Sequence, residues 1–226
     1  APTFQAQPVA LEKVGLAEQT EKINASLIAL TREAAPGCLV AGDIATLAAH
    51  LESWNPDCFD TMVENYRRQI RGLIDGGADL LVGETLLYAQ EAEAILTAAE
   101  LECAGAVMLS FTMQPDGSLF SGADAGKVLH ELESAGADAV GFNCVAADMM
   151  TPHLVSKLRR YTSLPLICKP NAGNPVINKD GIAEYDLSAD AFAEIMKQCA
   201  GNGARLLGGC CGTDPSFIAA LERALA

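Results

Sequence analysis

Aromatic residues are scarce in this chain of 226 residues. They make up 5% of the sequence, with a single Trp. A hydrophobic fraction of 50% still provides for a sizeable core, which must then be packed mostly by Ala, Leu, Ile and Val. The length fits one α/β domain better than two, so we expect residues 1–226 to form a single domain.

Positive charge is also in short supply. Lys and Arg number 15 against 29 Asp and Glu, which gives a formal net charge of −14. A folded surface this acidic repels phosphate backbones, so a nucleic-acid partner is not expected. No apolar stretch is long enough to span a membrane, and residues 1–4 show no basic head followed by an apolar run. We therefore expect a cytoplasmic protein without a membrane partner.

Cysteine, in contrast, is abundant, with eight residues. In a reducing compartment, cysteines are metal ligands, catalytic groups or simply buried side chains. Five of them lie singly in apolar or helix-like contexts and are interpreted as plain thiols: Cys38, Cys58, Cys103, Cys168 and Cys199. The remaining three are Cys144, Cys210 and Cys211.

Strand-like and helix-like segments alternate along the chain. The strand-like runs are almost continuously apolar, which is typical of a parallel sheet covered on both faces. The expected strands are 39–43, 78–85, 106–112, 138–143, 164–169 and 205–207. The expected helices are 60–74, 88–102, 126–134, 152–161, 191–201 and 217–226.

Successive βα units with short connections fit a doubly wound sheet or a barrel. The tripeptide Gly-Ala-Asp precedes two of the strands, at 77–79 and 136–138, and this self-similarity favours a barrel. A closed barrel needs eight strands, whereas six are clear here and Thr3-Phe4 could be the tail of a seventh. The fold class predicted is therefore α/β, a (β/α)8 TIM barrel lacking its first βα unit. We expect residues upstream of Ala1 to complete it, because soluble proteins avoid open sheet edges.

Thiols stand at the expected carboxyl ends of two strands, where barrels of this kind carry their active sites. Cys144 closes one strand, while Cys210 and Cys211 follow another. Thiolates at neighbouring strand ends can converge on one metal ion, and three of them leave one position open on a tetrahedral Zn²⁺. The alternatives are core packing by chance and a disulfide, although adjacent cysteines bridge only through a strained turn.

Two segments resemble the signature of the zinc-dependent homocysteine S-methyltransferases, Gly-Phe-Asn-Cys at 141–144 and Gly-Gly-Cys-Cys-Gly-Thr at 208–213. The likeness continues through 83–85, 110–112 and 170–173 and covers essentially the whole chain. The family includes betaine–homocysteine methyltransferase, enzymes that use S-methylmethionine, and the homocysteine-binding module of cobalamin-dependent methionine synthase.

The resemblance implies an enzyme that transfers a methyl group to the thiol of homocysteine and forms methionine, with Zn²⁺ as its cofactor. It implies that Cys144, Cys210 and Cys211 are the metal ligands and catalytic groups, and that the homocysteine sulfur takes the fourth position. Zinc would activate that sulfur as a thiolate for attack on the methyl donor.

Four further residues match family positions around the substrate. Glu84 matches the acidic residue that helps hold the substrate amino group, and Thr3 and Phe4 match a pair that borders the substrate pocket. Asn171 matches a motif position near the metal. Asn143 is expected to orient Cys144 or its loop. The Asp-Gly…Gly-Thr motif of the family's first strand does not precede Thr3.

The methyl donor is left open among betaine, S-methylmethionine, S-adenosylmethionine and methylcobalamin. S-methylmethionine enzymes usually carry Arg where this chain has Gly212, which disfavours that donor. A homodimer is compatible with barrel helices, but no pattern selects a face. Three other readings compete: a phosphate-binding barrel with incidental cysteines that uses Gly208-Gly209, a structural zinc module, and a homocysteine-binding module of a multidomain methionine synthase.

Overall fold

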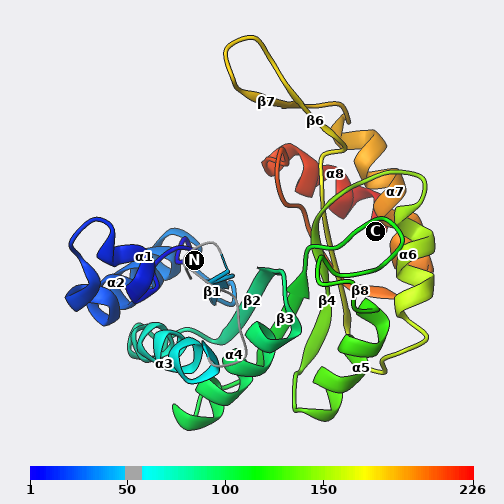
Figure 1. The fold of residues 1–226 in the computed structure, drawn as a ribbon. Coiled ribbons are helices and arrows are strands. Elements are labelled where there is room, and N and C mark those ends of the chain that lie inside the picture. The colour runs from blue at the N-terminus through cyan, green and yellow to red at the C-terminus, as the bar shows by residue number, and fades with distance from the viewer. Residues whose placement is uncertain (49–57) are drawn as a thin grey trace. The chain divides into compact units, whose positions relative to one another are not determined.

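The computed structural model describes residues 1–48 and 58–226 (Figure 1). The chain divides into two compact units. The first contains Ala1–Leu109 and Ser134–Asp138, and the second contains Ser110–Glu133 and Ala139–Ala226. Among the described residues, no helix combines the length and the apolar character needed to cross a membrane.

The first unit places two parallel strands beside a layer of helices. Its helices are α1 (Pro8–Glu12), the 3-10 turn η1 (Ala17–Gln19), α2 (Thr20–Ala34), α3 (Phe59–Asp75) and α4 (Ala89–Leu101). Its strands are β1 (Ala41–Ala45) and β2 (Leu80–Leu86), and β3 (Val107–Phe111) begins in it next to β2. The register of the parallel β1–β2 pair sets Ala45 opposite Glu84.

Helix α3 forms because its apolar side chains recur about once per turn. Met62, Tyr66, Ile70 and Leu73 line one face and are essentially fully buried. Helices α2 and α4 both pack against α3. This helix is therefore the centre of the first unit's helical layer.

The two Gly-Ala-Asp tripeptides build the same helix-to-strand turn. Gly77 and Gly136 both adopt positive φ, at 83° and 99°, a conformation that glycine tolerates without strain. The Asp79 carboxylate then accepts the Val40 N–H, and the Asp138 carboxylate accepts the Val107 N–H, each at 2.7 Å. The repeat recognised in the sequence is therefore a structural repeat, in which the Asp bonds to the start of the preceding strand.

The second unit holds most of α5 (Ala125–Ser134) together with β4 (Ala139–Ala146), α6 (Thr151–Leu158), β5 (Leu166–Asn171), α7 (Ala189–Gly201), β8 (Ala204–Leu207) and α8 (Pro215–Leu225). Its strand order is β3-β4-β5-β8, and the pairs β4–β5 and β5–β8 are parallel. Strands β4 and β5 approach closely at Gly141, where any Cβ would strike the backbone of Ile167. On α7 and α8, Phe192 and Phe217 meet edge to face with ring centroids 5.5 Å apart.

A two-stranded antiparallel hairpin, β6 (Pro175–Ile177) and β7 (Ala183–Tyr185), follows β5. Figure 1 shows it extending away from α7 and α8 of its own unit. Val176, Ile177 and Ile182 on this hairpin are all more than 60% exposed. It is therefore an appendage of the second unit rather than part of its sheet.

The six expected strands and six expected helices all form, with ends shifted by a few residues. The segments from α1 to α2 and the β6–β7 hairpin were not anticipated. Thr3 and Phe4 form no strand. The Thr3 hydroxyl instead donates to the Asp43 carbonyl at 2.8 Å, so a side-chain bond stands where strand pairing was expected.

Candidate metal centre

Three cysteine sulfurs of the second unit lie together. The Cys211 Sγ is 3.8 Å from the Cys144 Sγ and 4.0 Å from the Cys210 Sγ. Sulfurs arranged tetrahedrally around one zinc ion at about 2.3 Å would stand about 3.8 Å apart, so the spacing fits a shared ion. Within the part of the chain that the structure describes, no fourth His, Cys, Asp or Glu joins this group.

Cys144 is positioned by an unusual backbone conformation at the end of β4. Its φ is 57°, in the left-handed region that side-chain-bearing residues seldom adopt. The pairing of β4 with β5 changes register between Asn143 and Ala146, so the strand is irregular at this point. The Thr112 hydroxyl donates to the Cys144 carbonyl at 3.3 Å. Strained residues of this kind concentrate at functional sites.

The Cys210–Cys211 turn is fixed by the end of β5. The Cys210 N–H donates to the Pro170 carbonyl at 2.9 Å, and the Ala172 N–H donates to the Cys211 carbonyl at 2.9 Å. The Cys211 N–H donates to the Asn171 side-chain oxygen at 3.0 Å. Asn171 is therefore close to the thiols, but its amide oxygen is engaged in holding the turn.

Asn143 contacts the thiol group through Cys210. It is fully buried, and its side-chain oxygen accepts the Ser110 hydroxyl at 2.9 Å. Its Nδ2 donates to the Cys210 Sγ at 3.7 Å. Contacts of this kind orient the ligands of metal sites.

Because the three thiols lie close together, the negative charges of their thiolates repel one another when no cation is bound. The hydrogen-bonding contact with Cys210, followed by burial, raises the pKa of the Cys144 thiol far above its usual range. A divalent cation reverses this preference, because metal coordination deprotonates thiols. An all-sulfur donor set is soft and suits zinc better than magnesium or calcium.

Tyr185, at the end of β7, covers the turn that follows the paired cysteines. Gly212 has φ +77°, and a Cβ at this position would strike the Tyr185 ring. Burial, followed by the neighbouring Cys211, raises the pKa of Tyr185. Sequence reasoning missed this residue because three-residue strands carry too little pattern to be recognised.

The other candidate residues belong to the first unit. Glu84 is half-buried in β2, and Phe4 is partly exposed. Thr3 is fully buried, and its hydroxyl oxygen also accepts the Asp43 N–H at 2.8 Å. The structure thus brings Asn171 together with Cys144, Cys210 and Cys211 in the second unit.

A pocket of about 330 Å³ adjoins the thiol group and has Cys144 in its wall. Its lining comes from the carboxyl ends of β4 and β5, the segments that follow β3, β4 and β5, and the first half of α6. The lining residues are Thr112, Met113, Pro115, Phe120, Cys144, Val145, Ala146, Asp148, Met150, Thr151, Leu154, Asn171, Asn174 and Pro175.

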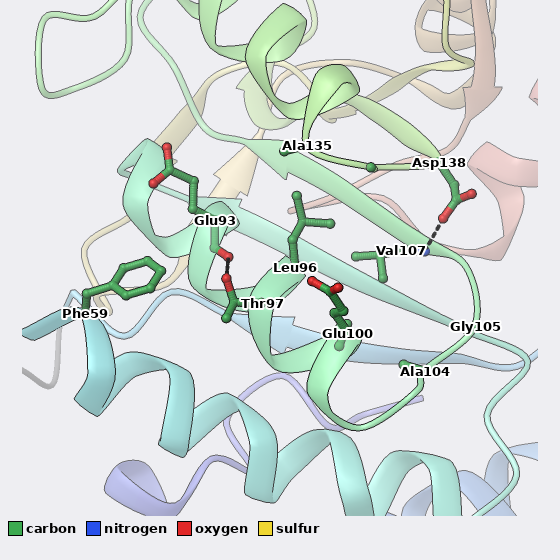
Figure 2. Close-up of a pocket in the computed structure, with 12 residues that line it drawn as sticks. Phe59, Glu93, Leu96, Thr97, Glu100, Ala104, Gly105, Val107, Ala135 and Asp138 are labelled. Atoms are coloured by element: carbon green, nitrogen blue, oxygen red, sulfur yellow. Dashed lines mark hydrogen bonds between the residues drawn. The ribbon is translucent and has the colours of Figure 1, made fainter.

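A second pocket, of about 560 Å³, lies in the first unit along α4 and carries none of the candidate residues (Figure 2). Glu93 and Glu100 line it from the helix, and Asp138 lines it from the turn before β4. The Asp138 carboxylate is engaged with the Val107 N–H, as the dashed line in Figure 2 marks. The pocket is therefore a separate acidic groove on the helical side of its unit.

Comparison with known proteins identifies the relatives of this chain. The profile of the family described as homocysteine S-methyltransferase matches residues 1–225. The methionine synthase of Mycobacterium tuberculosis is 33% identical over 167 residues, which is 71% of this chain and 14% of that protein. The methionine synthase of Mycobacterium leprae is 32% identical over the same shares. The chain thus spans about 14% of the length of these curated relatives.

Solved structures point to the same family. The homocysteine methyltransferase MmuM from Escherichia coli, solved in an oxidized and in a metallated form, is 28% identical with a TM-score of 0.83. The similarity covers 98% of this chain and 77% of MmuM. The chain therefore belongs to the homocysteine S-methyltransferase family, as its motifs predicted. The match also confirms the predicted α/β class and the TIM-barrel fold of this family.

Proposed function

We propose that this protein transfers a methyl group to the thiol of homocysteine and so forms methionine. The observation that carries the proposal is the group of three sulfurs, all within 4.8 Å of one another, in a chain of this family. Cys144, Cys210 and Cys211 would hold the ion, and zinc fits their all-sulfur donor set.

A bound zinc ion supplies the positive charge that keeps a substrate thiol deprotonated near neutral pH, and three protein ligands leave one position for that sulfur. The chain's own residues position the ligands. The end of β5 fixes Cys210 and Cys211, and Asn143 donates to the Cys210 sulfur. Glu84 is assigned to the substrate amino group, on its match to the family motif.

The reaction is a displacement at carbon. The substrate sulfur forms a bond to the methyl carbon, and the bond from that carbon to the donor heteroatom breaks. The bonding electron pair leaves with the donor. The protein contributes positioning, which lowers the entropic cost of bringing donor and sulfur into line.

The phosphate-binding alternative is disfavoured by the backbone bonds of the loop after β8. The Gly208 N–H donates to the Cys168 carbonyl at 3.2 Å, and the Cys210 N–H donates to Pro170. These donors are directed at β5, so they are not available to cradle a phosphate. The structural-zinc alternative requires a fourth protein ligand, and the described residues offer none in the group.

The decisive experiment measures zinc content and X-ray absorption of the reduced protein, with and without homocysteine. We expect one zinc ion with three sulfur neighbours, and a fourth sulfur after homocysteine is added. Cys210→Ser should lose the zinc. Cys103→Ser, which changes an exposed thiol outside the group, should keep it. Zinc whose ligands do not change with homocysteine would contradict the proposal.

A second candidate function concerns the same chemistry in a larger assembly. The similarity to methionine synthases, of which the chain spans about 14%, favours a homocysteine-binding module whose methyl donor is methylcobalamin held elsewhere. Transfer from free methylcobalamin, assayed beside betaine and S-methylmethionine, distinguishes the two. A chain active only with methylcobalamin supports the module.

A further inference from the structure

We propose that Tyr185 is a positioning residue of the thiol group: its hydroxyl donates to the Cys211 sulfur, and its ring fixes the turn that follows this cysteine. Tyr185 is the last residue of β7, the second strand of the exposed hairpin. The inference rests on the proposed function, because Tyr185 would act on the bound ion through one of its proposed ligands. It gives the hairpin a role in the site.

The ring of Tyr185 lies against the backbone of the residue that follows the paired cysteines. Gly212 has φ +77°, and a Cβ at this position would strike the Cγ and Cδ2 atoms of the Tyr185 ring. A side chain at position 212 would therefore displace the ring, and it would also strain the backbone. The close approach of ring and glycine brings the phenol beside the thiols.

The hydroxyl of Tyr185 is directed at the thiol group. It makes a hydrogen-bonding contact with the Cys211 side chain, and the charges of Cys144 and Cys210 act on it as well. A phenol has a pKa of about 10, so it carries its proton near neutral pH. A metal-bound thiolate has no proton to give. The phenol is therefore the donor and the sulfur is the acceptor.

The base of the hairpin holds Tyr185 in this place. The Asn174 N–H donates to the Asp186 carboxylate at 2.9 Å, and the Leu187 N–H donates to the Ala172 carbonyl at 3.1 Å. These bonds close the hairpin on both sides of its two strands. The N–H of Ala172 is bonded in turn to the paired cysteines. The hairpin base and the cysteine turn thus share one anchor.

Two of the three sulfurs receive a donor from outside the group. Asn143 donates to the Cys210 Sγ, and Tyr185 contacts Cys211. A hydrogen bond to a metal-bound thiolate orients the sulfur and draws electron density from it. Partners of this kind are worth about 10- to 100-fold in metal affinity or activity. Loss of the Tyr185 donor should therefore weaken metal binding and change the metal–sulfur bonds.

The alternative is that Tyr185 only fills the space over Gly212. A packing role depends on the ring and not on the hydroxyl, so the Tyr185→Phe variant separates the two roles. Tyr161 provides a matched control. Its ring also lies against a glycine, Gly126. Within the described part of the chain, no contact joins Tyr161 to the thiols.

The first test measures the zinc affinity of the reduced protein by competition with a chromogenic chelator. We expect Tyr185→Phe to weaken zinc binding about tenfold and Tyr161→Phe to leave it unchanged. Tyr185→Leu, which removes the ring as well, should weaken zinc at least as much. Urea unfolding of the metal-free variants establishes that each one folds.

Cobalt(II) in place of zinc gives a readout that a packing role does not move. Thiolate ligands give bound cobalt a sulfur-to-metal charge-transfer band. A hydrogen bond lowers the energy of the sulfur lone pairs, so loss of the donor in Tyr185→Phe should shift this band to longer wavelength. Tyr161→Phe should leave the band in place.

Unchanged zinc affinity in Tyr185→Phe would overturn the inference, as would an unmoved cobalt band or an equal loss in Tyr161→Phe. The proposed function is judged separately by homocysteine. If homocysteine joins the zinc while Tyr185→Phe binds zinc as tightly as the unaltered protein, only this inference falls. If Tyr185→Phe weakens zinc while homocysteine leaves the zinc ligands unchanged, the role of Tyr185 stands and the methyltransferase proposal falls.

Discussion

At the scale of single residues, Cys144 combines a strained backbone with a crowded thiol. Its positive φ turns the chain at the end of β4, where the pairing with β5 becomes irregular. A side chain in the left-handed region costs about 1 kcal/mol relative to glycine. Cysteine at position 144 therefore lowers the free energy of unfolding relative to glycine, while its backbone conformation sets the position of the sulfur.

This cost can be measured without metal. In the reduced, metal-free protein, Cys144→Gly should be more stable than Cys144→Ala by about 1 kcal/mol, because glycine adopts this φ without strain. Urea unfolding of the two variants provides the comparison, and both should fail to bind zinc. Equal stability, or a more stable Ala variant, would show that Cys144 is not strained.

Glu102 shows how one carboxylate couples stability to pH. Its side chain is 13% exposed and pairs with Arg71 at 3.0 Å and Arg67 at 2.7 Å, both on α3. The hydrogen bond from Arg71, followed by that from Arg67, lowers the pKa of Glu102. The pair therefore stabilises the fold above the unfolded-state pKa of about 4.3, and this contribution is lost as pH falls through the lower folded-state pKa.

Glu102→Gln should accordingly destabilise the protein by about 1 kcal/mol at pH 7 and by progressively less toward pH 3. Urea unfolding across this pH range measures the difference. Glu100→Gln alters an exposed carboxylate of α4 for which the described residues show no ion pair, and serves as the control. A penalty for Glu102→Gln that does not change with pH would argue against the ion pair.

At the scale of elements, a buried carboxylate joins α4 to the chain after β1. Glu91 is fully buried. One of its oxygens accepts the Thr46 hydroxyl at 2.6 Å and the Leu47 N–H at 2.7 Å, and the other accepts the Leu87 N–H at 3.1 Å. A buried carboxylate is tolerated when its lone pairs are satisfied in this way.

Glu91→Gln replaces one acceptor by an amide donor that faces N–H groups, so we expect a loss of about 2 kcal/mol. Glu93→Gln, on the exposed side of the same helix, should change stability by less than about 0.5 kcal/mol. Thermal unfolding monitored by circular dichroism compares the two. Similar midpoints would show that the Glu91 contacts do not carry the expected energy.

Helices and strands whose apolar residues recur with a regular spacing were predictable from the sequence, and elements without such a spacing were not. The buried positions of α2 are Thr20, Asn24 and Ile28, two of them polar, so its period is not visible as hydrophobicity. Asn24 is buried because its amide donates to Ala6 and Thr20 carbonyls at 2.8 Å. Such contacts depend on distant chain positions and cannot be read locally.

At the scale of the whole molecule, the thiol group was predictable because parallel strands bring their carboxyl ends to one edge. The contacts that hold this group were not predictable. Asn143 contacts the Cys210 sulfur, and Tyr185 packs against Gly212, only because the tertiary fold brings these residues together. The roles assigned to Glu84, Thr3, Phe4 and Asn171 remain predictions, as do the single-domain organisation, a homodimer and a cytoplasmic location.

Metal binding should raise the stability of the folded protein as a whole. Free zinc at about a thousand times its dissociation constant stabilises by about 4 kcal/mol. For a chain of 226 residues this corresponds to a rise of about 10 °C in Tm. Scanning calorimetry in zinc buffers measures it. The Cys211→Ser variant should lose this rise in Tm. The Cys38→Ser variant, which changes an exposed cysteine elsewhere, should retain it. An undiminished rise in Tm for Cys211→Ser would exclude the thiol group as the zinc site.

The backbone bonds between the end of β5 and the Cys210–Cys211 turn have a consequence for discrimination among ions. The backbones of Cys210 and Cys211, two of the proposed ligands, are held by main-chain bonds to Pro170 and Ala172, which limits how far the turn can open. A larger thiophilic ion, such as cadmium, needs longer bonds to sulfur and a wider triangle of ligands. It would have to stretch the turn, so we expect the site to bind a larger ion less tightly than zinc.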